Sequence, residues 1–97
     1  MTFELGTILM TPGIRELIGS SEKAYDTVVD CLKRHADEDW GDLSDDDRQM
    51  NDDALEAERN GEPTDRLFSL YETDFAKLYI ITEYDRSVTT ILLPEEY

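Results

Sequence analysis

Apolar residues in the first third of the chain follow a short strand and then a helical period. Leu5 to Met10 has the length and composition of a strand. Thr11-Pro12-Gly13 ends it and starts a short helix to about Ile18, because Thr caps helices and Pro suits the first helical position. Ser20 or Ser21 then begins a second helix. Its apolar positions recur at three- and four-residue steps, which predicts packing on a sheet: Tyr25, Val28, Val29, Leu32 and Ala36.

β-branched and aromatic residues dominate from Arg66 onward, which is typical of strands. Short polar turns divide this part into three runs, Leu67 to Thr73, Leu78 to Tyr84 and Val88 to Leu93. The second run starts with four apolar residues in succession, as in a central strand covered on both faces. We therefore predict one α+β domain over residues 1–97: an N-terminal strand, three helices, and a three-stranded antiparallel meander that the first strand joins. The residues after Pro94 are expected to form a frayed tail.

The third predicted helix carries most of the chain's charge clustering. Ser44 is a suitable cap, acidic residues fill the first turn, and Gly61 and Pro63 end the helix. From Asp45 to Glu58 it holds seven acidic residues and one base. Those residues rise about 21 Å at about 1.5 Å each, so the net charge is about one per 3.5 Å. A single DNA strand carries one charge about every 3.4 Å.

A surface that imitates phosphates must show its charges on one side. At about 100° per residue, Asp45, Asp52 and Glu56 fall within about 40° of one another, and Asp53 and Asp46 continue the same sector. An adjacent narrow apolar stripe is predicted to seat the helix: Met50, Ala54 and Ala57. Asp47 and Glu58 fall past that stripe, so the segregation of charge is imperfect. Four acids just before the helix extend the acidic field: Asp37, Glu38, Asp39 and Asp42.

Composition narrows the classes of partner. The chain has 24 acidic and nine Lys or Arg residues, for a formal net charge of −15. Direct binding to nucleic acid or to an anionic membrane is therefore disfavoured, and a basic partner is expected. The single cysteine permits no internal disulfide, and no apolar run is long enough to span a membrane, so we expect a cytoplasmic protein.

Metal and catalytic motifs fit poorly. A calcium-loop register from Asp37 places Gly41 one position early and ends on Arg48, and a register from Asp42 puts Asp47 where glycine is required. Cys31 and His35 lie four residues apart on a helix, but no third group orients them, and a semi-buried Cys with a surface His is the simpler interpretation. We predict no enzyme, no metal and no cofactor. A divalent-ion-dependent enzyme stays the weakest alternative.

Trp40 lies between the second and third helices and has two interpretations. It is either a core residue of a small domain or an aromatic anchor within an acidic interface.

Several segments resemble a family of small bacterial proteins found on plasmids and phage-derived elements. These segments are Leu5-Gly6 to Thr11-Pro12-Gly13, Trp40-Gly41-Asp42-Leu43, Asn51, Ile81-Thr82-Glu83 and Asp85 to Tyr97. The resemblance implies a compact bacterial cytosolic domain of mobile-element origin and brings no catalytic residue with it. That setting favours inhibitors of host defence, including anti-CRISPR and anti-restriction proteins.

The leading hypothesis is a non-enzymatic acidic inhibitor that imitates nucleic acid and binds a basic nucleic-acid-binding protein, with a CRISPR or restriction complex as the expected target. Its predicted contact residues are Asp39, Trp40, Asp42, Asp45, Asp46, Asp52, Asp53 and Glu56. Two alternatives stay open. The acids are a solvated face that keeps the protein soluble, or the protein is a small interaction or regulatory module, antitoxin-like, that uses a sheet edge or helix packing. The sequence leaves the oligomeric state open.

Overall fold

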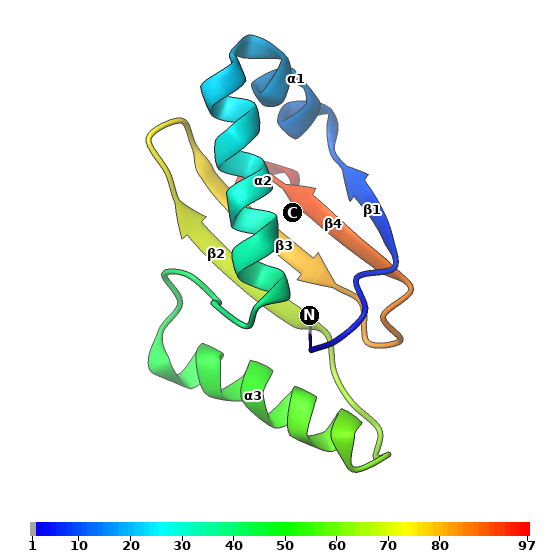
Figure 1. Ribbon diagram of the computed structural model, residues 1–97. Helices are drawn as coiled ribbons and strands as arrows, with labels where there is room; N and C mark the ends of the chain where they lie inside the picture. The colour runs from blue at the N-terminus through cyan, green and yellow to red at the C-terminus, as the bar shows by residue number, and fades with distance from the viewer. Residues whose placement is uncertain (1) are drawn as a thin grey trace.

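One mixed sheet of four strands organises the chain, with three α-helices around it (Figure 1). The computed structural model describes residues 2–97. In chain order its elements are β1 (Thr7–Met10), α1 (Pro12–Ser20), α2 (Glu22–Ala36), α3 (Asp45–Arg59), β2 (Leu67–Glu72), β3 (Lys77–Thr82), β4 (Val88–Leu92) and the 3-10 helix η1 (Pro94–Glu96). The α+β class is confirmed.

The sheet order is β1-β4-β3-β2. β2, β3 and β4 form the antiparallel meander that the sequence predicts. β1 joins the sheet at its edge, beside β4 and parallel to it, with Thr7 opposite Val88. The sheet is therefore mixed, a detail that the run of strand-like segments did not specify.

Helix starts follow from local chemistry. The hydroxyl of Ser21 accepts a hydrogen bond from the Ala24 backbone N–H at 3.0 Å, and that of Ser44 accepts one from Asp47 at 3.2 Å. Each satisfies a donor that a helix start leaves open. The expected caps of the second and third helices are thus confirmed.

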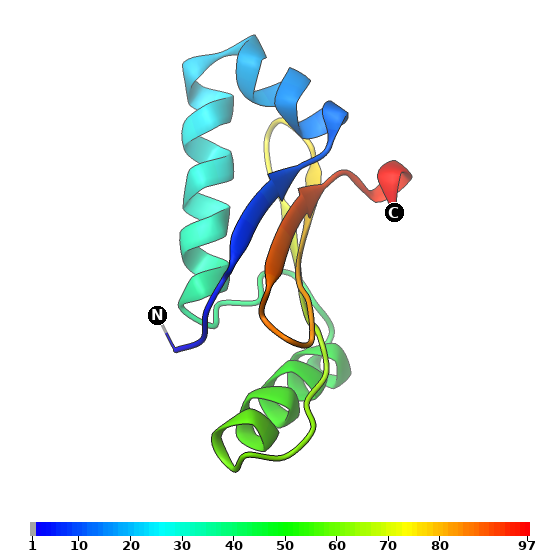
Figure 2. The same cartoon turned by 90° about the vertical axis from the view of Figure 1, so that its right-hand side faces the viewer.

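Helix α2 covers one face of the sheet (Figures 1 and 2). Val28 and Cys31 pack there with Ile14 of α1 and with apolar residues of the strands, Tyr71, Leu78, Ile80 and Ile91. The buried face of α2 is rotated from the predicted stripe, since Tyr25 is 50% exposed and His35 is fully buried. The expectation of a surface histidine is therefore wrong.

Three strand hydroxyls explain how His35 lies in the core. Its Nδ1 is 2.5 Å from Ser69 Oγ, and its Nε2 is 2.9 Å from Thr82 Oγ1. Thr82 lies 2.7 Å from the hydroxyl of Thr89, which donates its proton to the Leu5 carbonyl. Because that last direction is fixed, Thr82 donates to Thr89 and Nε2–H donates to Thr82. Burial lowers the pKa of His35 to about 4, so the ring is neutral at pH 7 and its Nδ1 accepts from the Ser69 hydroxyl.

The C-terminal residues are docked, which corrects the prediction of a frayed tail. The Glu96 carboxylate accepts hydrogen bonds from the Thr11 hydroxyl at 2.6 Å and from the backbone N–H of Gly13 at 2.9 Å. A carboxylate at the start of α1 is favoured by the helix dipole and by open N–H donors. These bonds, with the Thr11 hydroxyl first, lower the pKa of Glu96.

Candidate functional site: an acidic helix face

Helix α3 lies past one end of the sheet and is held mainly at the edge of β2 (Figures 1 and 2). The Asn51 carboxamide donates to the Phe68 carbonyl at 2.7 Å and accepts from the Phe68 N–H at 3.1 Å. It thereby pairs with β2 as a neighbouring strand would. Ala54 and Leu55 are buried against a second core cluster, formed with Phe3, Trp40, Leu43 and Leu67.

The rest of the β2 edge is sealed by the loop between α2 and α3. The Leu70 N–H donates to the Trp40 carbonyl at 3.2 Å, and the Asp42 N–H donates to the Leu70 carbonyl at 2.7 Å. Gly41 makes this approach possible, because a Cβ there would lie 2.0 Å from the Leu70 oxygen and its φ is +80°. Only glycine combines that φ with so close a backbone contact. The loop that leads into α3 is thus fixed to the sheet.

The predicted seat of α3 is wrong in part. Ala54 is buried, but Met50 is 63% exposed, and Asn51 and Leu55 take the inward positions instead. A polar residue replaces an apolar one there because the open backbone groups of β2 need hydrogen-bond partners.

Five acidic side chains of α3 are exposed on the side away from this seat: Asp45, Asp46, Asp52, Asp53 and Glu56. At about 100° per residue their mean direction is roughly 160° from that of the buried residues. They extend over about 17 Å of helix. Ion pairs within residues 2–97 involve Glu38, Asp39, Glu58 and Glu72, and none of these five. The structure therefore brings these five predicted residues together on one outward face.

The only base within the acidic run is directed away from that face. The Arg48 guanidinium donates to the carbonyls of Gly41, at 2.5 Å, and Leu43, at 3.1 Å. It holds the loop before α3, and the other base of the helix, Arg59, pairs with Glu38, so neither arginine of α3 forms an ion pair with the five outward carboxylates.

Asp39 and Asp42 serve the scaffold. Asp39 accepts two hydrogen bonds from the Arg34 guanidinium, at 2.7 and 3.2 Å, and that pairing lowers the Asp39 pKa. Asp42 accepts from the backbone N–H of Glu72 at 2.8 Å. Sequence position alone grouped these two with the outward acids, but their charges are engaged within the molecule.

Trp40 is a core residue. It is 3% exposed and packs near Phe3 and His35, so its interpretation as a core residue is confirmed and its interpretation as a surface anchor is wrong. Its indole N–H donates to Asp52 Oδ1 at 3.1 Å. Trp40 therefore contributes indirectly, by orienting one carboxylate of the acidic face.

A buried arginine that no sequence motif singles out anchors the far end of α3. Arg86 is 8% exposed, and its Nε lies 2.6 Å from the Glu58 carboxylate. It also donates to the carbonyls of Asp65, at 2.9 Å, and Glu83, at 3.1 Å. The sequence did not indicate this role, because Arg86 lies in a turn and is 28 residues from Glu58.

The Cys31 and His35 pair has no nucleophilic character. Burial raises the pKa of the Cys31 thiol to about 11. Both ring nitrogens of His35 are already bonded to Ser69 and Thr82, so neither is open to take a proton from the thiol. Over residues 2–97, no three His, Cys, Asp or Glu side chains gather where they could hold a metal ion.

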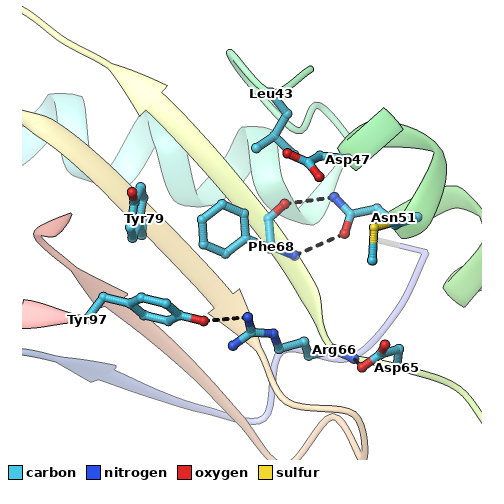
Figure 3. Close-up of a pocket in the computed structure, with 9 residues that line it drawn as sticks. Leu43, Asp47, Asn51, Asp65, Arg66, Phe68, Tyr79 and Tyr97 are labelled. Atoms are coloured by element: carbon cyan, nitrogen blue, oxygen red, sulfur yellow. Dashed lines mark hydrogen bonds between the residues drawn. The ribbon is translucent and has the colours of Figure 1, made fainter. Parts of the chain in front are cut away.

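A groove of about 330 Å³ lies between α3 and the sheet face opposite α2 (Figure 3). Three aromatic rings line it, from Phe68, Tyr79 and Tyr97, with centroids 4.8 to 6.4 Å apart. Asp47, Asp65 and Arg66 also line it. The alternation of the strands could have indicated these rings, since Phe68 and Tyr79 have the parity opposite to that of the core residues.

Comparison with protein-family models, curated proteins and solved structures found no match. The resemblance to mobile-element proteins stays a prediction. In the part of the chain that the structure describes, every helix is too short or too polar to cross a membrane.

Proposed function

We propose that this protein is a non-enzymatic inhibitor whose α3 face imitates a nucleic-acid backbone and occupies the basic groove of a nucleic-acid-binding protein. The observation that carries the proposal is the set of five exposed carboxylates on one side of α3, none of them ion-paired within residues 2–97. A groove built for phosphates presents Lys and Arg side chains, and these are complementary to a rigid row of carboxylates.

Rigidity supports the proposal as much as charge does. The acids are on a regular helix that is fixed by the Asn51 carboxamide near its middle and by the Glu58–Arg86 pair near its end. A partner therefore meets carboxylates in a set arrangement and loses less conformational entropy on binding than it would with a disordered acidic tail.

The proposed target class is a CRISPR or restriction defence complex acting in the bacterial cytoplasm. The support is the resemblance to proteins of plasmids and phage-derived elements, together with the net charge of −15. Such complexes hold nucleic acid in positively charged channels, which is the surface that an acidic helix fits.

The test compares two charge variants. The first neutralises the outward face with Asp45→Asn, Asp46→Asn, Asp53→Asn and Glu56→Gln, and leaves Asp52 because it binds Trp40. The matched control removes the same number of charges from exposed positions elsewhere: Glu16→Gln, Asp26→Asn, Asp30→Asn and Glu83→Gln.

Partners of both variants and of the wild type are captured from a bacterial lysate and eluted with duplex DNA. The proposal predicts a nucleic-acid-binding protein that the wild type and the control retain and the face variant does not. With the purified partner, affinity should fall about tenfold or more between about 50 and 300 mM salt, because screening shortens the reach of exposed charges. Equal retention by the face variant and the control would refute mimicry.

An open sheet edge favours the alternative function, a small interaction or regulatory module. Over residues 2–97, β1 has a strand neighbour on its β4 side only. Leu9, Met10 and Tyr25 are 48%, 39% and 50% exposed around this edge. Partner binding that is insensitive to salt and is lost on Met10→Asp would support this function instead.

A further inference from the structure

We infer that the groove between α3 and the aromatic face of the sheet binds an arginine side chain of the partner. The inference deepens the proposed function and rests on it, since a basic partner supplies the arginine. Its support is the chemistry of the groove and not the acidic face alone.

The floor of the groove is aromatic. Phe68, Tyr79 and Tyr97 lie in edge-on or tilted contact with one another, and all three line the groove (Figure 3). A guanidinium is attracted to the face of such rings within about 6 Å of a centroid. The protein itself contains one example, because the Arg66 guanidinium lies 5.5 Å from the Tyr97 centroid and donates to its hydroxyl.

The wall and rim add carboxylates. Asp47 and Asp65 line the groove, and neither belongs to an ion pair of the described residues. They outnumber the one base there, Arg66, so an entering cation is favoured and a phosphate is not. At about 330 Å³, the groove is at the lower end of the usual range for small-ligand sites, which suits one side chain.

Arginine is favoured over lysine on geometric grounds. A planar guanidinium stacks on aromatic rings and pairs with carboxylates through its N–H groups, and the groove is lined by both, whereas a rounded, strongly hydrated ammonium gains less from a ring. Met50, which is exposed on α3 and lines the groove, supplies an adaptable wall for the aliphatic stem.

The test is an NMR titration with three blocked tripeptides, Gly-Arg-Gly, Gly-Lys-Gly and Gly-Leu-Gly. We expect the arginine peptide to shift the ring signals of Phe68, Tyr79 and Tyr97 and to bind about two- to fivefold more tightly than the lysine peptide. Equal binding by the two cations, or stronger binding by the leucine peptide, would overturn the inference.

Two matched variants distinguish binding of arginine in the groove from general attraction of a cation to the negatively charged helix. Asp47→Asn removes a charge from the groove, and Asp53→Asn removes one from the outward face of the same helix. Arginine-peptide binding should weaken at least about threefold in the first and stay within about twofold in the second. Equal weakening in both means a diffuse field and overturns the site.

Failure of the groove site and failure of the proposed mimicry can be told apart by experiment. If the face variant loses the partner but the arginine peptide does not bind, only the groove site fails. If the peptide binds the groove but the face variant keeps the partner, only mimicry fails.

Discussion

Protonation of His35 should destabilise the fold as the pH falls from 7 toward 4. Burial first, and the positive charge of Arg86 second, lower the His35 pKa from its ordinary 6.5 to about 4. The hydrogen-bond chain acts in the same direction. A protonated ring donates from both nitrogens, so the Ser69 hydroxyl, which now donates to Nδ1, loses its acceptor.

The direction and size of the pH effect on stability follow from the difference in His35 pKa between the folded and the unfolded chain. Between pH 6.5 and about 4 the unfolded chain carries a proton on His35 and the folded chain does not, so acid favours unfolding. The stability contribution is therefore complete above pH 6.5 and is lost as the pH falls through that window. At pH 4.5 the loss is about 2 to 3 kcal/mol, and it approaches about 3 kcal/mol below pH 4, at about 1.36 kcal/mol per pKa unit.

The assay is urea unfolding of wild type and His35→Gln from pH 7.5 to 4.5, followed by the fluorescence of the buried Trp40, whose ring centroid lies 5.6 Å from that of His35. The variant loses stability at neutral pH, since it breaks the hydroxyl chain. Its free energy of unfolding should fall less steeply with acid, so the difference between the two proteins narrows by about 2 to 3 kcal/mol at pH 4.5. Carboxylate titration is common to both proteins and cancels in the difference.

Parallel pH curves for the two proteins would refute this reasoning. So would a His35 ring that titrates near pH 6.5 in the folded protein by NMR, because the hydrogen-bond directions would then be wrong.

Two further predictions concern the attachment of α3. Glu58→Gln leaves the guanidinium of Arg86 buried without its carboxylate and should lower the free energy of unfolding, measured in urea, by about 2 kcal/mol. A fully buried pair would cost more, but the Glu58 side of this pair is partly open to solvent. Glu62→Gln, an exposed control, should change the unfolding free energy by less than about 0.5 kcal/mol, and equal effects would contradict the ion-pair role. Asn51→Ala removes both hydrogen bonds to Phe68 and should cost about 2 kcal/mol and speed hydrogen exchange at the Phe68 amide; unchanged exchange would show that α3 does not hold this edge.

The helix starts and the meander were predictable because their causes are local. Ser21 and Ser44 cap within three residues of themselves, and strand alternation is visible in the residues of each strand. His35 and Asn51 were not predictable in this way, since their partners lie 34, 47 and 17 residues away. A signal for His35 did exist. Ser69 shares strand parity with Leu67 and Tyr71, which places a hydroxyl on a core face that needs a polar partner.

The sequence predicted which acidic residues gather around the candidate site, but not which of them face solvent and which are bonded within the molecule. Helical spacing placed the outward acids together, yet spacing could not show that Asp39 binds Arg34 or that Glu58 binds Arg86. Both ion pairs depend on the tertiary fold, which decides which side chains lie close together. Trp40 shows the same limit, because a tryptophan between two helices has no local mark that separates core from surface.

The division of the acidic run explains how the fold tolerates its charge. Glu38, Asp39, Asp42 and Glu58 are each bonded to a base or a backbone N–H, so they stabilise the scaffold. The exposed carboxylates of α3 face solvent, where high dielectric and salt weaken their mutual repulsion to a modest cost. Asp52 belongs to both sets, since it also accepts from Trp40, but neutralising the other four outward carboxylates leaves the bonds that hold α3 intact. Charge on the outward face can thus be varied for binding without dismantling the helix that presents it.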